Sequence, residues 1–166
     1  LAEDEPGVVD METLLKGVCD KANFIDLVEN FILFDDSTGE TKKILARNHQ
    51  FLGVNRAIEA VRDRANRNGK LGVFWHTQGA GKSYSMVMFT RKVHRRLGGN
   101  FTFLVLTDRD DLDTQIYKTF AGCGVVDNDR DPCRASSGEH LGRLLALQKT
   151  HIFSLIHKFN RDVEPD

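Results

Sequence analysis

The feature that most constrains this chain is a glycine-rich stretch at residues 71–85, LGVFWHTQGAGKSYS. A short apolar run at its start predicts a buried strand over 71–75, and the segment after Ser83 has the pattern of a helix. Gly79 and Gly81 allow a tight turn in which bare backbone N–H groups approach an anion. The start of the helix adds unpaired donors and the positive end of its dipole. The stretch therefore predicts a phosphate-binding loop between a strand and a helix.

Two side chains at the end of this loop supply the chemistry of a nucleotide site. The Lys82 ammonium can reach the β- and γ-phosphates, and the Ser83 hydroxyl can ligate Mg²⁺. The strict pattern has glycine at position 76, where this chain has His76. A glycine-rich turn with a chance Gly-Lys-Ser is the alternative, and the flanking strand and helix favour the nucleotide site. The candidate phosphate-binding residues are Thr77, Gln78, Gly79, Ala80, Gly81, Lys82 and Ser83.

Composition narrows the class of protein. The 166 residues are 40% hydrophobic and 28% charged, as in globular domains, and the net charge of −1 leaves nucleic-acid contacts to local patches. Cys19, Cys123 and Cys133 lack CxxC spacing, which favours reduced thiols inside the cell, although a Cys123–Cys133 pair across a loop is the alternative. No apolar run approaches the roughly 20 residues of a membrane span. We expect a cytoplasmic protein without a membrane partner, and both ends look cut, as in a fragment.

The first 45 residues predict a linker and a packing segment without chemistry. Residues 1–9 are acidic and carry Pro6-Gly7, which is typical of a linker. Apolar residues recur at helical spacing between Met11 and Phe31, and a turn cluster follows at 35–39. The short apolar runs on either side of that cluster can pair as a hairpin. We therefore expect a small helical and hairpin subdomain over residues 1–45.

Residues 46–166 predict an α/β domain. Strand candidates at 71–75, 101–106 and 151–156 alternate with helical patterns, one of which is expected to end at Asn68-Gly69. This order implies a parallel sheet flanked by helices, with ligands at the carboxyl ends of the strands. The helix after Ser83 also carries a basic face that we expect to be solvated. That face comprises Arg91, Lys92, Arg95 and Arg96.

Three motifs together resemble superfamily-2 helicases. They are Arg47-x-x-Gln50, the phosphate loop at 77–83, and Leu106-Thr107-Asp108-Arg109-x-x-Leu112-x-x-Gln115. More narrowly, they resemble the motor (restriction) subunit of type I restriction-modification enzymes, in which a histidine at the position of His76 is expected. The stretch 152–159 resembles the segment just ahead of that family's acidic Walker B motif. The resemblance covers nearly the whole chain and implies a RecA-like P-loop domain truncated before Walker B.

The resemblance also implies roles for four further residues. Gln50 would contact the adenine edge, for which its amide offers one donor and one acceptor, and Arg47 would lie near the base. The alternative for Gln50 is a solvent-facing residue at the start of a helix. Thr107 and Arg109 would contact the DNA sugar-phosphate backbone, which positions a protein without specifying sequence. The alternative there is a capping loop with a solvated arginine.

The implied activity is ATP hydrolysis with Mg²⁺ coupled to translocation of double-stranded DNA, and DNA cleavage in the complete protein. The implied partners are the methylation and specificity subunits of a prokaryotic restriction-modification complex. Because the Walker B acids and second motor lobe are expected outside this chain, we expect the chain alone to bind ATP weakly and hydrolyse almost none. The alternatives are another superfamily-2 helicase, a small-molecule kinase, or a non-catalytic ATP-sensing module. Residues 101–108 are alternatively a Walker B strand that ends in a metal-binding aspartate.

Overall fold

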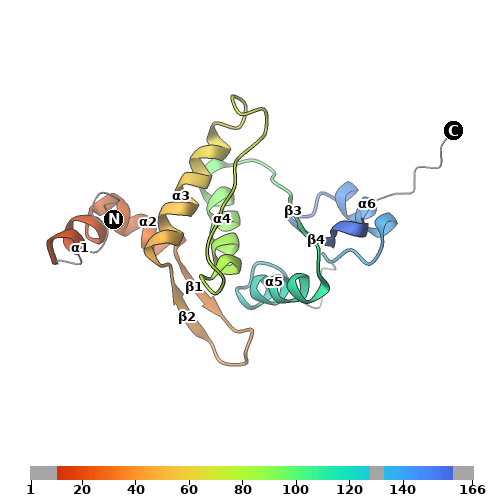
Figure 1. Cartoon of the computed structure of the whole chain (residues 1–166), viewed down its shortest axis with the longest axis horizontal. Coiled ribbons are helices and arrows are strands. Elements are labelled where there is room, and N and C mark those ends of the chain that lie inside the picture. Colours follow the sequence, from red (N-terminus) through yellow and green to blue (C-terminus); the bar gives the residue numbers. More distant parts are fainter. Residues whose placement is uncertain (1–10, 128–132, 159–166) are drawn as a thin grey trace. The chain divides into compact units, whose positions relative to one another are not determined.

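The computed structural model describes residues 11–127 and 133–158 (Figure 1). The expected linker at 1–9 and the last residues of the family resemblance, Phe159 and Asn160, lie outside this range. The chain divides into two compact units. The first comprises Leu1–Phe34 with Lys43–Val93, and the second comprises Asp35–Lys42 with His94–Asp166.

The start of the described chain forms two short helices and a hairpin, as the apolar spacing predicts. They are α1 (Met11–Val18), α2 (Lys21–Asn30), β1 (Ile32–Asp35) and β2 (Lys42–Leu45). Asp20 caps α2, since its carboxylate accepts hydrogen bonds from the backbone N–H groups of Ala22 and Asn23.

The core of the first unit lies along two longer helices, α3 (Asn48–Arg62) and α4 (Lys82–Leu97). Their buried apolar residues include Val54 and Ile58 on α3, and Val87, Met88 and Val93 on α4. Helix α3 ends earlier than the expected Asn68-Gly69. The Asp63 carboxylate accepts hydrogen bonds from the side chains of Asn66 and Arg67, which stabilises a series of turns in place of further helix.

The prediction of a buried strand at 71–75 is wrong. The segment has no regular secondary structure, and the side chains of Val73 and Trp75 are 95% and 76% exposed. A strand needs a neighbour for its backbone hydrogen bonds. In the described part of the chain the strands pair only as β1 with β2 and as β3 with β4, so the segment at 71–75 has no such neighbour.

The basic face of α4 is also less solvated than expected, because Lys92 is buried. Its ammonium donates hydrogen bonds to both carboxylate oxygens of Asp26 at 2.5 Å and to the Asn55 side chain, and it lies 4.8 Å from the centroid of the Phe31 ring. Burial alone would raise the pKa of Asp26, but hydrogen bonds from Lys92, Asn30 and Asn55 hold it below its usual value. Lys92 therefore ties α2, α3 and α4 together.

The second unit contains the parallel sheet that the alternating pattern predicts. Strands β3 (Phe103–Thr107) and β4 (His151–Leu155) run parallel, with Phe103 opposite His151 and Thr107 opposite Leu155. Every residue of β4 is buried. The backbone of Cys133 to Ala135 extends the sheet, since Phe153 N–H donates to Cys133 O and Ala135 N–H donates to Phe153 O. The loops after Thr107 and Leu155 therefore lie at the same edge of the sheet.

Helices α5 (Asp110–Gly122) and α6 (Gly138–Ala146) pack on this sheet, and a short 3₁₀ turn η1 (Ile156–Lys158) follows β4. The structure is thus a mixed α/β fold with a small parallel sheet and flanking helices. None of Cys19, Cys123 and Cys133 is in a disulfide bond. Within residues 11–127 and 133–158, no helix is long and apolar enough to cross a membrane.

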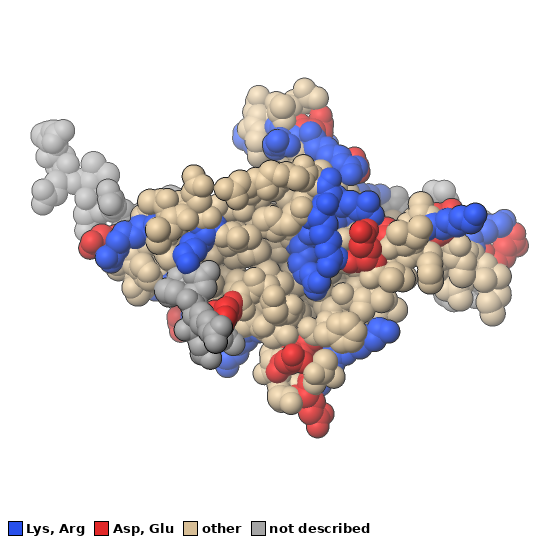
Figure 2. Space-filling model, turned by 180° about the vertical axis from the view of Figure 1, so that it is seen from behind, with Lys and Arg blue, Asp and Glu red and all other residues tan. Residues whose placement is uncertain are grey.

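On the face seen in Figure 2, Lys and Arg side chains lie in several separate groups, with acidic side chains next to some of them, and most of the surface is neither acidic nor basic. This mixture agrees with the net charge of −1. Any contact with a polyanion on this face therefore depends on a local group of cations.

Candidate nucleotide-binding site

The glycine-rich loop ends at the N-terminus of α4, which begins at Lys82 as the pattern predicts. Within the loop, Ala80 N–H donates to Thr77 O at 3.3 Å. Gly79 and Gly81 have φ angles of 77° and 79°, in the region that side chains other than glycine rarely adopt. A Cβ at Gly79 would meet no atom within 4 Å, so the loop has open space beside it.

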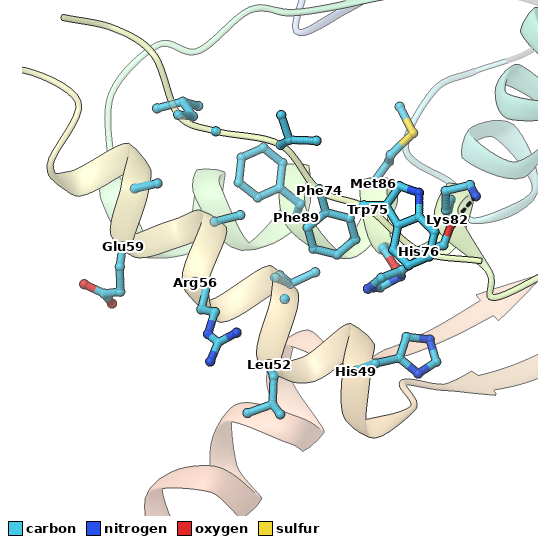
Figure 3. Close-up of a pocket in the computed structure, with 18 of the residues that line it drawn as sticks. His49, Leu52, Arg56, Glu59, Phe74, Trp75, His76, Lys82, Met86 and Phe89 are labelled. Atoms are coloured by element: carbon cyan, nitrogen blue, oxygen red, sulfur yellow. Dashed lines mark hydrogen bonds between the residues drawn. The ribbon is translucent and has the colours of Figure 1, made fainter. Parts of the chain in front are cut away.

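The Lys82 ammonium lies over the loop and does not point away from it. It donates hydrogen bonds to His76 O at 2.7 Å and to Thr77 O at 3.2 Å (Figure 3). A phosphate bound in the loop would replace these two carbonyls as the partner of the ammonium. The backbone N–H groups in the first turn of a helix have no carbonyl partner inside it, and Ser83 lies half-buried in this turn.

Helix α3 braces the loop through two side chains from its first turn. Gln50 is buried, and its amide nitrogen donates to Gly81 O at 3.0 Å and to Ser85 Oγ at 3.1 Å. The Gln50 oxygen accepts from the N–H of Arg47 at 2.9 Å, and His49 Nε2 lies 3.2 Å from Ala80 O. Gln50 is therefore not solvent-facing. Because both N–H groups of its amide already donate, Gln50 would have to release one of these hydrogen bonds to donate to adenine.

Beside the loop lies a hollow of about 960 Å³ between α3, the extended segment at 71–76 and α4. The apolar side chains of Phe74, Met86 and Phe89 line this hollow, and Lys82 and His76 lie at one end of it (Figure 3). A Cβ at Gly53 would lie 2.5 Å from the Phe74 ring, so glycine at this position lets the segment pack against α3.

His76 connects this apolar hollow to the loop. Its ring centroid lies 4.6 Å from that of His49 and 4.4 Å from that of Phe74. Burial, helped by the positive charges of His49 and Lys82, lowers the pKa of His76 below its usual value of 6.5. The environment of His76 therefore favours the neutral imidazole.

The residues present fit a nucleoside triphosphate with Mg²⁺. Backbone donors at the start of α4 and the Lys82 ammonium suit phosphate oxygens, and the Ser83 hydroxyl suits Mg²⁺. Nowhere in the described ranges do three or more His, Cys, Asp or Glu side chains group as a metal site. A metal ion at this loop would therefore take some of its ligands from the phosphate oxygens.

The other two candidate residues lie in the second unit and differ in exposure. Thr107 is buried, and its hydroxyl donates to Asp113 Oδ1 at 3.4 Å. Arg109, just before α5, has a side chain that is 68% exposed and pairs with Asp111. Sequence reasoning missed Asp113, an acidic residue that shares the buried face of α5 with Ile116 and Phe120. The sequence signal for its burial was the position of Asp113 on the same helix face as these apolar residues.

The SWI2/SNF2 ATPase family matches residues 49–166, and the chain therefore belongs to this family of ATPases. It is 35% identical over 157 residues to the type I restriction enzyme HindI endonuclease subunit of Haemophilus influenzae, a match that covers 90% of the chain and 15% of that protein. It is 33% identical over 160 residues to the putative type I restriction enzyme MjaIXP endonuclease subunit of Methanocaldococcus jannaschii, which covers 91% of the chain and 14% of that protein.

These relatives confirm the resemblance to type I restriction subunits that the three motifs indicate. The chain spans less than one sixth of the length of each of the two relatives, with 15% and 14% covered.

Proposed function

We propose that this chain is the nucleotide-binding part of the ATP-dependent DNA motor in a type I restriction endonuclease subunit. The observation that carries the proposal is the Lys82 ammonium at the N-terminus of α4, held over a loop whose glycines adopt positive φ angles. Membership of an ATPase family and similarity to restriction subunits support the same function.

In this proposal the loop residues from Thr77 to Ser83 bind the triphosphate of ATP. Lys82 neutralises negative charge on the phosphates, and Ser83 helps to hold Mg²⁺, which offsets the charge that develops during hydrolysis. Arg47 and Gln50 lie near the adenine in this proposal. The reaction drives translocation of double-stranded DNA, and the complete protein cleaves DNA in a complex with methylation and specificity subunits.

The experiment is an ATPase assay on the full-length subunit to which we assign this chain, with and without double-stranded DNA. Lys82→Ala should lower the DNA-stimulated rate by about 10²-fold or more, because a charge aimed at the reacting phosphate is lost. Lys70→Ala, which changes an exposed lysine shortly before the loop, is the matched control and should leave the rate unchanged.

The outcomes separate the alternatives. ATP binding without DNA-stimulated hydrolysis in the full-length protein would indicate a sensing module, and phosphoryl transfer to a metabolite would indicate a kinase. The chain of residues 1–166 should bind ATP weakly and hydrolyse almost none. Turnover by this chain at the rate of the full-length subunit would contradict the proposal.

A further inference from the structure

We propose that Asp113 and Arg134 are positioning residues for the loop at 107–109, and that they set how tightly the exposed Arg109 engages the DNA backbone. The inference rests on the proposed function, because it takes double-stranded DNA as the ligand of Arg109. In the inference, Asp113 and Arg134 do not touch DNA themselves and act only through the position of Arg109.

The Asp113 carboxylate joins three segments of the second unit. Its side chain is 5% exposed. Oδ1 accepts the hydrogen bond from Thr107 at the end of β3, and Oδ2 accepts from Arg134 Nη2 at 2.5 Å and Nε at 2.9 Å. Asp113 itself lies in the first turn of α5, where its N–H donates to Arg109 O at 3.0 Å. The loop is therefore anchored at both ends by one residue.

Arg134 is in turn held by several contacts that keep its guanidinium in place. Nη2 donates to Thr114 Oγ1 at 3.0 Å, and the guanidinium lies 5.3 Å from the centroid of the Tyr117 ring. The backbone on either side of Arg134 bonds to Phe153 of β4. The charge pair thus fixes the start of α5 against the sheet.

The loop that this pair holds carries an exposed cation. Arg109 is the last residue before α5, and its side chain contacts Asp111, which is as exposed as Arg109 itself. An exposed ion pair of this kind contributes little to stability, so a phosphate oxygen can replace Asp111 as the partner of Arg109. The pair of Asp113 with Arg134 behaves differently, because Asp113 is buried although Arg134 is 36% exposed, so removing Arg134 leaves an uncompensated carboxylate at the start of α5. That charge would shift the helix start, and Arg109 with it.

The test measures the DNA concentration that half-maximally stimulates ATP hydrolysis by the full-length subunit, together with kcat and the KM for ATP. Asp113→Asn and Arg134→Met should each raise that DNA concentration about tenfold, as expected when a phosphate contact is displaced, while kcat at saturating DNA and the KM for ATP stay unchanged. Arg134→Lys should recover part of the loss. Glu139→Gln, at an exposed acid on α6, is the matched control and should behave as the unmodified protein.

Each other outcome overturns the inference in a recognisable way. If DNA does not stimulate the unmodified protein, the proposed function fails and the inference fails with it. If Arg109→Ala weakens the response to DNA while Asp113→Asn and Arg134→Met do not, the function stands and the positioning role is wrong. A parallel change in the KM for ATP and in the melting temperature would indicate a structural role only. Should Asp113→Asn not fold, the DNA concentrations required by Arg134→Met and Arg134→Lys decide the matter. Equal values for Arg134→Met and the unmodified protein would contradict the positioning role.

Discussion

Replacing His151 by phenylalanine should remove a pH dependence of stability that arises from this one side chain. His151 begins β4 and is buried among aromatic rings, with centroid distances of 5.3 Å to Phe103, 5.5 Å to Phe120 and 6.0 Å to His94. Its Nε2 is buried without a hydrogen-bond partner in the described structure. Burial, with a smaller effect of the positive charge on His94, lowers the pKa of His151 from 6.5 to about 4.

The sign and size of the effect follow from this lowered pKa. Between pH 6.5 and about 4 the unfolded chain binds a proton at His151 that the folded chain does not, so the free energy of unfolding decreases as the pH falls. Across the whole interval between the two pKa values, the free energy of unfolding falls by about 3.4 kcal/mol. About 1.8 kcal/mol of this change occurs between pH 7 and pH 5. The carboxyl groups of Asp26, Asp63 and Asp111 have pKa values lowered from 3.8, so they titrate below this interval.

Urea unfolding of the 166-residue chain, followed by far-UV circular dichroism at pH 7 and pH 5, measures the difference. The unmodified chain should lose about 1.8 kcal/mol more than His151→Phe over this interval, whatever the absolute stability of the variant. His157→Gln, at an exposed histidine, should leave the pH dependence unchanged. Equal pH dependence in the unmodified chain and His151→Phe, or an imidazole NMR titration of His151 near pH 6.5, would refute the reasoning.

Two further stability predictions test the first unit by thermal unfolding. Lys92→Met should destabilise by about 3 kcal/mol, because it leaves the half-buried Asp26 carboxylate without its charged partner. The double variant with Asp26→Asn should lose less, and Lys43→Met, at an exposed lysine, should change the stability little. Gly53→Ala should destabilise by about 1–3 kcal/mol and shift the Trp75 emission, because its Cβ would displace the Phe74 ring. The matched Gly142→Ala, whose Cβ meets no atom within 4 Å, should stabilise α6 by up to about 1 kcal/mol, and a loss of stability there would contradict the geometric argument.

Helix positions were predictable because they depend on residues close in sequence. The apolar spacing located α1 to α6, although α3 ends at Arg62 and not at Asn68 because the side chains around Asp63 favour turns. Glycines at 79 and 81 predicted a tight loop, and both adopt positive φ angles. The parallel pairing of β3 with β4 followed from the alternation of strands and helices.

The burial of polar side chains was not predictable in the same way. Lys92 belongs by spacing to a basic helix face, but its partner Asp26 lies 66 residues away in the sequence. Thr107 has the place of an exposed loop residue in its motif, yet it is buried against Asp113. Gln50 could have been solvent-facing, and it instead bonds to Gly81, 31 residues later.

The sequence by itself determined the helices, the glycine-rich loop ahead of α4 and the resemblance to type I restriction subunits, because periodicity, backbone freedom and motif order are local properties. Tertiary structure decided which charged and polar groups are buried, because their partners come from distant elements. It also decided that residues 71–75 do not form a strand here, because a strand exists only beside another strand that completes its hydrogen bonds.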